Sequence, residues 1–171
     1  MEEEKIEIKA DATDIVEHLQ TLADLSAKCN HITEMGVRGV VSTWAFAAGI
    51  PKGGKLVSID IVQAPQEELD RVTDFSKRKG IDFEFILGDT LKIEIAETDL
   101  LFIDTLHEYD QLKKELELHA DKAKKFIVFH DTESCKRELW PAIDEFLKDH
   151  REWGIKAAWN NCNGLMCLRR I

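Results

Sequence analysis

The chain has 171 residues and a formal net charge of −10, with 33% charged and 44% hydrophobic residues. This length suits one domain with a sizeable core, which we expect to span 1–171. The negative charge argues against nucleic acid, whose phosphates are usually bound by an excess of Lys and Arg. The start, MEEEKIEIK, lacks an export pattern, and no apolar run reaches the roughly 18 residues of a membrane span. We therefore expect a cytoplasmic protein without a membrane partner.

Seven short apolar runs alternate with amphipathic stretches, a pattern typical of βαβ units around a mainly parallel sheet. The expected strands are 32–37, 55–61, 83–89, 99–105, 125–131, 154–160 and 165–171. The expected helices are 11–29, 42–49, 65–79, 108–123 and about 137–149. Pro141 is a candidate for the true start of the last helix, because proline is best tolerated in a first turn.

The last two runs are joined by NCNG, residues 161–164, which is too short for a crossover helix and carries an Asn-Gly hairpin signal. The order is therefore five βα-type units followed by an antiparallel pair. We predict a Rossmann-like α/β fold: a mainly parallel seven-stranded sheet that ends in an antiparallel hairpin, with helices on both faces. Residues 1–30 form an N-terminal segment and helix, and 31–171 form the core.

The turn after the first run, EMGVRGVVST, is the first candidate ligand site, because ligands of open α/β sheets bind beyond the carboxyl ends of the strands. Gly36 and Gly39 allow a sharp turn and a close ligand. Ser42 or Thr43 is suited to cap the next helix. The free amides of such a turn can receive a carboxylate or a phosphate.

The dinucleotide fingerprint G-x-G-x-x-G is not met, because Arg38 and Val41 occupy its second and third glycine positions. Two acidic residues nevertheless follow the next two strands. Asp60 is placed to accept hydrogen bonds from both hydroxyls of a ribose. Asp89, in Gly88-Asp89-Thr90, can accept from an exocyclic amine such as that of adenine. Together these positions indicate a nucleoside-containing ligand, and the unmatched fingerprint argues against NAD.

A second group of polar residues follows the fourth and fifth strands, in FIDTLHEYDQ and FHDT. Asp104 and Asp131 are expected to converge at the rim of the sheet, where they could share Mg²⁺ or a similar hard cation. Such a cation would lower the pKa of a bound hydroxyl. Alternatively, His107 could act as a general base. In the structural alternative, Asp104 only caps the next helix and His130 only satisfies backbone groups.

With these motifs in this order, the chain resembles the class I S-adenosylmethionine (SAM)-dependent methyltransferases. It is most similar to the small methyltransferase family 24, which is related to cephalosporin-hydroxylase-like and macrocin-type O-methyltransferases. The segments that carry the resemblance are EMGVRGVVST, LVSIDI, GDT, LLFIDTLHEYDQLKKELEL, FIVFHDT, WPAIDEFL and NNCNGLMCLRR.

The resemblance implies a SAM site whose methionine and ribose part is lined by Glu34, Gly36 and Ser42, with Gly39 and Thr43 in the same turn. It implies that the Asp60 side chain holds the ribose hydroxyls and that Asp89 faces the adenine.

On the acceptor side, Asp104 and Asp131 match positions that bind metal in metal-dependent members, and His107 matches a histidine that could serve as base.

Two departures from the family pattern concern these sites. Family members often have two glycines where this chain has Gly39-Val40, so Val40 is expected to crowd the methionine tail. The loop after strand four usually reads Asp-Gly-Asp-His or similar, whereas here Asp104 is followed by Thr105-Leu106-His107. The missing second acidic residue counts against metal binding more than against SAM binding.

The leading hypothesis is a SAM-dependent O-methyltransferase that acts on a small hydroxylated molecule, such as a sugar or natural product. The first alternative is a weakly active or inactive SAM-binding interaction module, and the second is an NAD-dependent oxidoreductase. No separate substrate domain is expected. The acceptor pocket must therefore be shaped by helix 11–29, by the loops after strands four and five, or by a neighbouring subunit of a homo-oligomer.

Overall fold

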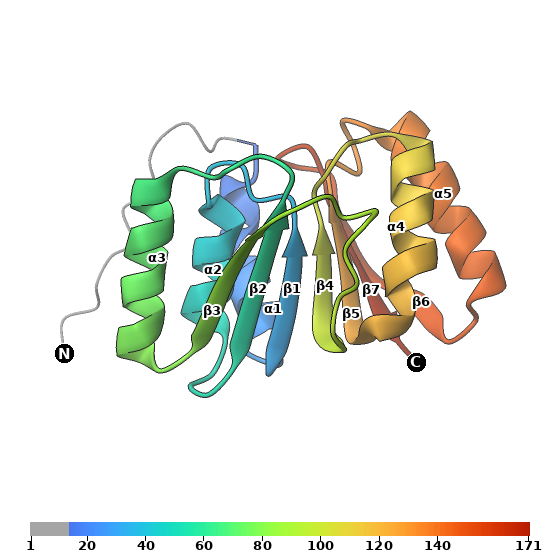
Figure 1. Cartoon of the computed structure of the whole chain (residues 1–171). Helices are drawn as coiled ribbons and strands as arrows, with labels where there is room; N and C mark the ends of the chain where they lie inside the picture. Colours follow the sequence, from blue (N-terminus) through green and yellow to red (C-terminus); the bar gives the residue numbers. More distant parts are fainter. Residues whose placement is uncertain (1–13) are drawn as a thin grey trace.

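The computed structural model describes residues 14–171, whose seven strands form one sheet in the order β3-β2-β1-β4-β5-β7-β6 (Figure 1). The neighbouring strands among β1 to β5 pair in parallel, whereas β7 is antiparallel to both β5 and β6. This arrangement confirms the predicted Rossmann-like sheet with its closing hairpin. The strands are β1 (His31–Met35), β2 (Lys55–Asp60), β3 (Asp82–Leu87), β4 (Thr98–Ile103), β5 (Ala123–His130), β6 (Trp153–Trp159) and β7 (Leu165–Arg170).

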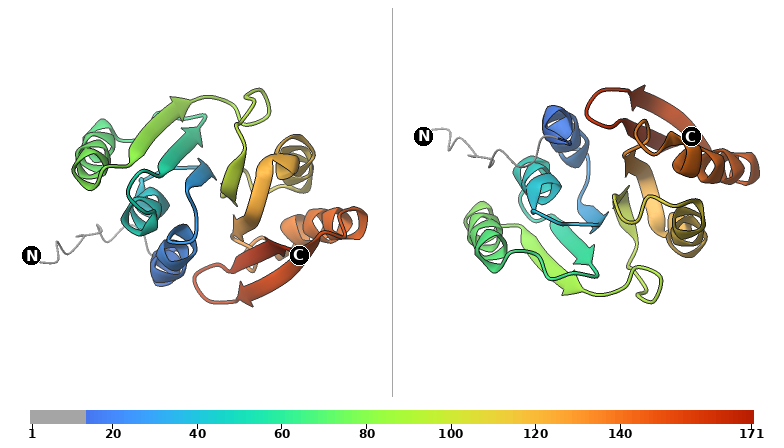
Figure 2. Two further views of the ribbon diagram at one scale, coloured as in Figure 1. Left: turned by 90° about the horizontal axis from the view of Figure 1, so that it is seen from below. Right: turned by 90° about the horizontal axis from the view of Figure 1, so that it is seen from above.

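Helices cover both faces of the sheet: α1, α2 and α3 lie on one face, and α4 and α5 on the other (Figure 2). None of the helices in the described part of the chain has the length and apolar character that crossing a membrane requires. The helices are η1 (Val16–His18), α1 (Leu19–Ser26), α2 (Val41–Gly49), α3 (Gln66–Lys79), α4 (Tyr109–His119), η2 (Ala120–Lys122) and α5 (Lys136–Asp149).

Two helix boundaries differ from the sequence prediction. Of the expected helix 11–29, residues 11–13 lie outside the described part, and the remainder is a 3₁₀ turn followed by the shorter α1. Pro141 lies inside α5 and does not begin it. The buried face of α5 already includes Leu139, so packing extends the helix ahead of the proline and overrides its preference for a first turn.

The connection from β3 to β4, residues 88–97, contains no helix, so only four of the five parallel strands are followed by one. Ile93 and Ile95 of this connection instead pack against the sheet face that α4 and α5 cover elsewhere. The expectation of five βα units is therefore wrong at this crossover.

The turns after β1, β2, β3 and β4 are joined by backbone hydrogen bonds at the carboxyl ends of the strands. The Gly36 amide donates to the Ile59 carbonyl at 2.9 Å, and the Asp104 amide donates to the Met35 carbonyl at 2.8 Å. The Gly88 amide donates to the Asp60 carbonyl at 2.8 Å. The segments that follow these four strands consequently form one edge, at the top of Figure 1.

Gly36 is required by this close approach. Its φ is +88°, and a Cβ atom there would lie 1.9 Å from the Asp104 carbonyl oxygen. Gly39, in contrast, has no left-handed φ, and a Cβ atom there would meet nothing closer than Val41 Cγ2 at 3.7 Å. The two glycines of the predicted ligand turn therefore have different roles: the first is fixed by the fold, and the second is not.

We predict that Gly36→Ala lowers the free energy of unfolding by about 2–5 kcal/mol, because it combines an unfavourable φ with a backbone clash. Gly39→Ala, the matched control, should change it by less than about 1 kcal/mol. Denaturant unfolding of both variants measures the difference. Equal losses in the two variants would contradict the assignment of the close approach to Gly36.

Candidate functional site

The Glu34 carboxyl is completely buried and accepts three hydroxyl hydrogen bonds. Ser42 Oγ donates to Oε1 at 2.5 Å, and Thr43 Oγ1 and Ser58 Oγ donate to Oε2 at 2.7 and 2.5 Å. Burial raises the pKa of Glu34 to about 7, although the three hydroxyls oppose that rise. This network joins β1 to β2 and to the first turn of α2.

Two sequence expectations change at this network. Ser42 and Thr43 do not cap α2, because their hydroxyls bind Glu34 and the N-cap position is occupied by Val40 without a side-chain cap. Val40 does not crowd the ligand turn either: its side chain is fully buried in the core beneath α1, α2 and α3. Val40 instead strains the backbone, because a β-branched residue here adopts a left-handed φ of +65°. Contact of Glu34, Ser42 and Thr43 with a ligand stays a prediction.

The Asp60 carboxylate, at the end of β2, organises the turn after β1. Its Oδ2 accepts from the amides of Val37 and Arg38 at 2.7 and 3.0 Å, and Oδ1 accepts from the Val62 amide at 2.8 Å. A carboxylate offers about four lone-pair directions, so a further donor can still be accepted. The predicted contact with ribose stays a prediction, and the structure adds a role in shaping the turn.

Asp89 lies at the same edge, directly after Gly88 and thus next to Asp60 through the backbone. Its Oδ1 accepts from the Leu91 amide at 3.0 Å, and its Oδ2 pairs with Lys92 Nζ at 2.8 Å. The hydrogen bond from Lys92 lowers the pKa of the Asp89 carboxyl. Its predicted contact with adenine stays a prediction.

Sequence reasoning missed an apolar pair on this edge. Ile61 and Val62 directly follow Asp60 and are 69% and 67% exposed. Two adjacent branched side chains left in water beside a candidate nucleoside site would gain burial against a planar base. The signal was present in the sequence, because the apolar run of β2 continues past the aspartate that ends the strand.

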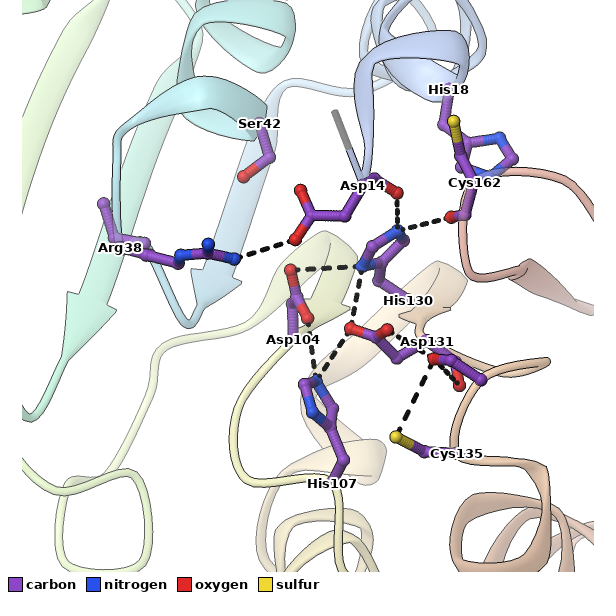
Figure 3. A network of polar contacts seen from close by, with 12 residues as sticks. Asp14, His18, Arg38, Ser42, Asp104, His107, His130, Asp131, Cys135 and Cys162 are labelled. Atoms are coloured by element: carbon purple, nitrogen blue, oxygen red, sulfur yellow. Dashed lines mark hydrogen bonds and ion pairs between the residues drawn. The ribbon is translucent and has the colours of Figure 1, made fainter. Parts of the chain in front are cut away.

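Beyond β4 and β5, four side chains form a closed ring in which carboxylates and imidazoles alternate (Figure 3). His107 Nε2 lies 3.2 Å from Asp104 Oδ1 and 3.0 Å from Asp131 Oδ2. His130 Nδ1 lies 3.5 Å from Asp104 Oδ2 and 3.1 Å from Asp131 Oδ2. The structure therefore brings the predicted Asp104, His107 and Asp131 together and adds His130 to them.

The ring balances its own charge. The hydrogen bond with Asp104, supported by Asp131, raises the pKa of His107 to about 10. Burial alone would lower the pKa of His130, but the Asp104 and Asp131 carboxylates raise it to about 10. Burial would raise the pKa of each carboxyl, yet the two imidazoles hold the pKa of both below the ordinary range. Near neutral pH His107 is a cation, so it could act as a base only after losing that proton.

Groups from distant parts of the chain support the ring (Figure 3). His130 Nε2 lies 3.0 Å from the Asp14 carbonyl oxygen and 3.1 Å from that of Cys162. The predicted contact of His130 with backbone groups is thus confirmed for one of its nitrogens. Ser134 Oγ donates to Asp131 Oδ1 at 2.6 Å, and Asp131 itself has a left-handed φ of +58°.

Asp14 also connects the ring to the turn after β1. Its Oδ2 pairs with Arg38 Nη1 at 2.8 Å, while its carbonyl oxygen contacts His130. Figure 3 shows Asp14 lying between these two residues. The candidate ligand turn and the ring are therefore neighbouring parts of one polar network.

No protein-family profile and no curated protein sequence matches this chain. Solved structures do share its fold. A methyltransferase from Geobacter sulfurreducens superposes with a TM-score of 0.67 at 16% identity, over 89% of this chain and 77% of that one. An O-methyltransferase from Bacillus cereus in complex with S-adenosylhomocysteine (SAH) gives 0.60 at 15% identity, over 96% and 82%. An SAH-bound methyltransferase from Podospora anserina gives 0.58 at 14%, over 95% and 89%. The fold is that of the class I methyltransferases.

The Glu34 network generates a prediction about pH. The pKa of Glu34 rises from 4.5 to about 7 on folding, so the native state holds a proton that the unfolded chain has lost. Stability contributed by the protonated carboxyl is therefore lost as pH rises through this window. We expect the free energy of unfolding of Glu34→Gln, relative to that of the native sequence, to rise by about 3 kcal/mol between pH 4.5 and pH 7.5.

Denaturant unfolding at several pH values measures this gain. Glu67→Gln, which removes a carboxylate at an exposed position of α3, is the matched control. If the difference in unfolding free energy between Glu34→Gln and the native sequence does not change with pH, the buried carboxyl ionises normally.

Proposed function

We propose that this protein is a SAM-dependent methyltransferase that methylates a hydroxyl oxygen of a small acceptor, such as a sugar or a natural product. One observation carries the proposal: on a methyltransferase fold, the turn that Asp60 orders and an Asp-His ring lie side by side at the carboxyl edge of the sheet. The SAH bound to two structures of similar fold supports SAM as the cofactor.

The cofactor would occupy the edge formed by the turns after β1, β2 and β3. Asp60 would accept from the ribose hydroxyls while it keeps the turn ordered through the amides of Val37 and Arg38. Ile61 and Val62 would pack against the adenine face, and Asp89 would accept from the adenine amine. The backbone at Gly39 leaves space for the methionine part, since nothing lies within 3.7 Å of its missing Cβ.

The reaction is a displacement at carbon. The acceptor oxygen attacks the methyl group of SAM, the carbon–sulfur bond breaks, SAH leaves and the hydroxyl proton is released. Positioning the two reactants in line and excluding water supply most of the catalysis. No nucleophile of the protein takes part, and the ring beyond β4 and β5 is the group that can manage the proton.

Two routes for the proton follow from the ring. A divalent cation held by Asp104 and Asp131, for which the sequence suggests Mg²⁺, would lower the pKa of a bound hydroxyl. The donor atoms of Asp104, His107 and Asp131 fit such an ion, because they lie within 4.8 Å of one another. In the second route, His107 takes the proton. With a pKa of about 10, His107 carries a proton near neutral pH, and it must release that proton before it can either bind the cation or act as the base.

We predict that SAM and SAH bind with sub-millimolar Kd and that NAD does not, as measured by calorimetry. Asp60→Ala should weaken SAM binding at least 10-fold, because it removes the ribose acceptor and the support of the turn. Asp74→Ala, on the exposed side of α3, is the control and should leave the affinity unchanged. Failure of both SAM and SAH to bind would refute the proposed function.

We predict that Asp104→Asn lowers kcat at least 10-fold and changes the Kd for SAM by less than about 3-fold, because Asp104 lies on the acceptor side. Release of SAH in the presence of phenols, catechols and sugars measures turnover, and calorimetry measures the Kd. A variant that loses SAM affinity in proportion to turnover would place Asp104 on the cofactor side.

A further inference from the structure

We infer that Glu115 of α4 is a positioning residue for both halves of the candidate site. It holds the segment that bears Asp89 and the segment that bears Asp104. The inference rests on the proposed function, because that function assigns Asp89 to the cofactor and Asp104 to the acceptor side. The contacts that carry it lie within the chain itself and involve no ligand.

The Glu115 carboxyl is completely buried and accepts hydrogen bonds from threonines of two different loops. Thr90 Oγ1 donates to Oε1 at 2.6 Å, and Thr105 Oγ1 donates to Oε2 at 2.8 Å. Gln111, one turn earlier in α4, donates its Nε2 to Oε1 at 2.8 Å. Each carboxyl oxygen therefore holds one loop, and the side chain joins the turn after β3 to the loop after β4.

Both threonines directly follow a predicted site residue. Thr90 comes after Asp89, and Thr105 comes after Asp104. A hydrogen bond that fixes each threonine also fixes the peptide that orients the preceding aspartate, and a site depends on such support for its geometry. Glu115 thus acts on the two aspartates through their neighbours.

The turn after β3 needs this anchor because the connection 88–97 contains no crossover helix of its own. The His119 side chain gives a second one, since its Nε2 lies 2.7 Å from the Thr90 carbonyl oxygen. Gln111, Glu115 and His119 recur every four residues, so they lie on one face of α4. This face of α4 takes the place of the missing helix in holding the turn.

The alternative is that Glu115 only packs α4 against the sheet. Leu112 and Leu116 already do so, because both are buried in the core beneath α4 and α5. A buried carboxyl is tolerated only where donors satisfy its oxygens, and outside α4 the donors here come from loops. The contacts therefore favour positioning of the loops over packing of the helix.

The test removes one hydroxyl at a time while it keeps the shape of the side chain. Thr90→Val should weaken SAM binding about 5-fold and Thr105→Val should lower kcat about 5-fold, as expected for one buried hydrogen bond, with the other quantity changed less than about 2-fold. Calorimetry measures the Kd, and release of SAH with phenols, catechols and sugars measures kcat.

Glu115→Met removes both acceptors and should produce both losses together. In the Glu115→Met background neither valine substitution should add a further loss, because the hydrogen bond that it would remove is already absent. If the losses add in full, the threonines act independently of Glu115, and the inference is overturned.

Thr98→Val is the matched control. Thr98 is 1% exposed at the start of β4, and its Oγ1 lies 3.1 and 3.0 Å from the carbonyl oxygens of His31 and Leu100. The variant loses comparable buried contacts at the opposite edge of the sheet, so it should lower stability and leave the Kd and kcat unchanged. If it weakens SAM binding as much as Thr90→Val does, the effect is a general loss of stability, and the inference is overturned.

Hydrogen exchange of the SAM-free chain separates this inference from the proposed function. Glu115→Met should speed exchange in both 89–93 and 104–108, whereas Thr98→Val should not. Unchanged exchange in either segment overturns the inference. If the native chain binds neither SAM nor SAH, the proposed function alone is rejected, and exchange still decides the role of Glu115. Should Glu115→Met fail to fold, Thr90→Val and Thr105→Val should each speed exchange in their own segment.

Discussion

The buried carboxyl of Glu34 is the contact on which the candidate cofactor site depends. Its partners are three hydroxyls, from β2 and from the first turn of α2, and burial of a carboxyl is tolerated only with such partners. Because the network fixes α2 against β1, residues 36–40 must connect the two over a short distance. The positive φ values of Gly36, Arg38 and Val40 are the consequence. The turn is therefore shaped from within the protein, before any ligand arrives.

Val40 illustrates how this constraint is met without glycine. A left-handed backbone at a β-branched residue costs about 1–3 kcal/mol. Complete burial of a valine side chain contributes about 1.5–3 kcal/mol, so the two effects are of similar size. Substituting valine for glycine in this turn exchanges backbone strain for core packing. The ligand side of the turn stays open because the side chain faces the core.

The strands and their succession along the chain could be predicted from the sequence because buried parallel strands are continuous apolar runs, as in β4 and β5. The turns that bear Asp60, Asp104 and Asp131 followed from the strand ends. A contact of His130 with backbone groups could be predicted, but its partners and its place in the ring could not, because the carbonyl groups of Asp14 and Cys162 that orient it are 116 and 32 residues away in the chain. Long-range backbone contacts leave no periodic signal in a sequence.

These long-range contacts bring segments from both ends of the described chain to the acceptor side. Through His130, the ring between β4 and β5 is joined to the segment before η1 and to the β6–β7 loop. The loop is itself strained, with positive φ at Cys162, Asn163 and Gly164, and its Asn163 carbonyl accepts from the amides that follow Thr132. A proton or a metal ion that neutralises the two aspartates therefore also affects the contacts with the segment before η1 and with the β6–β7 loop. The same residues set the charge of the ring and hold these two distant segments together.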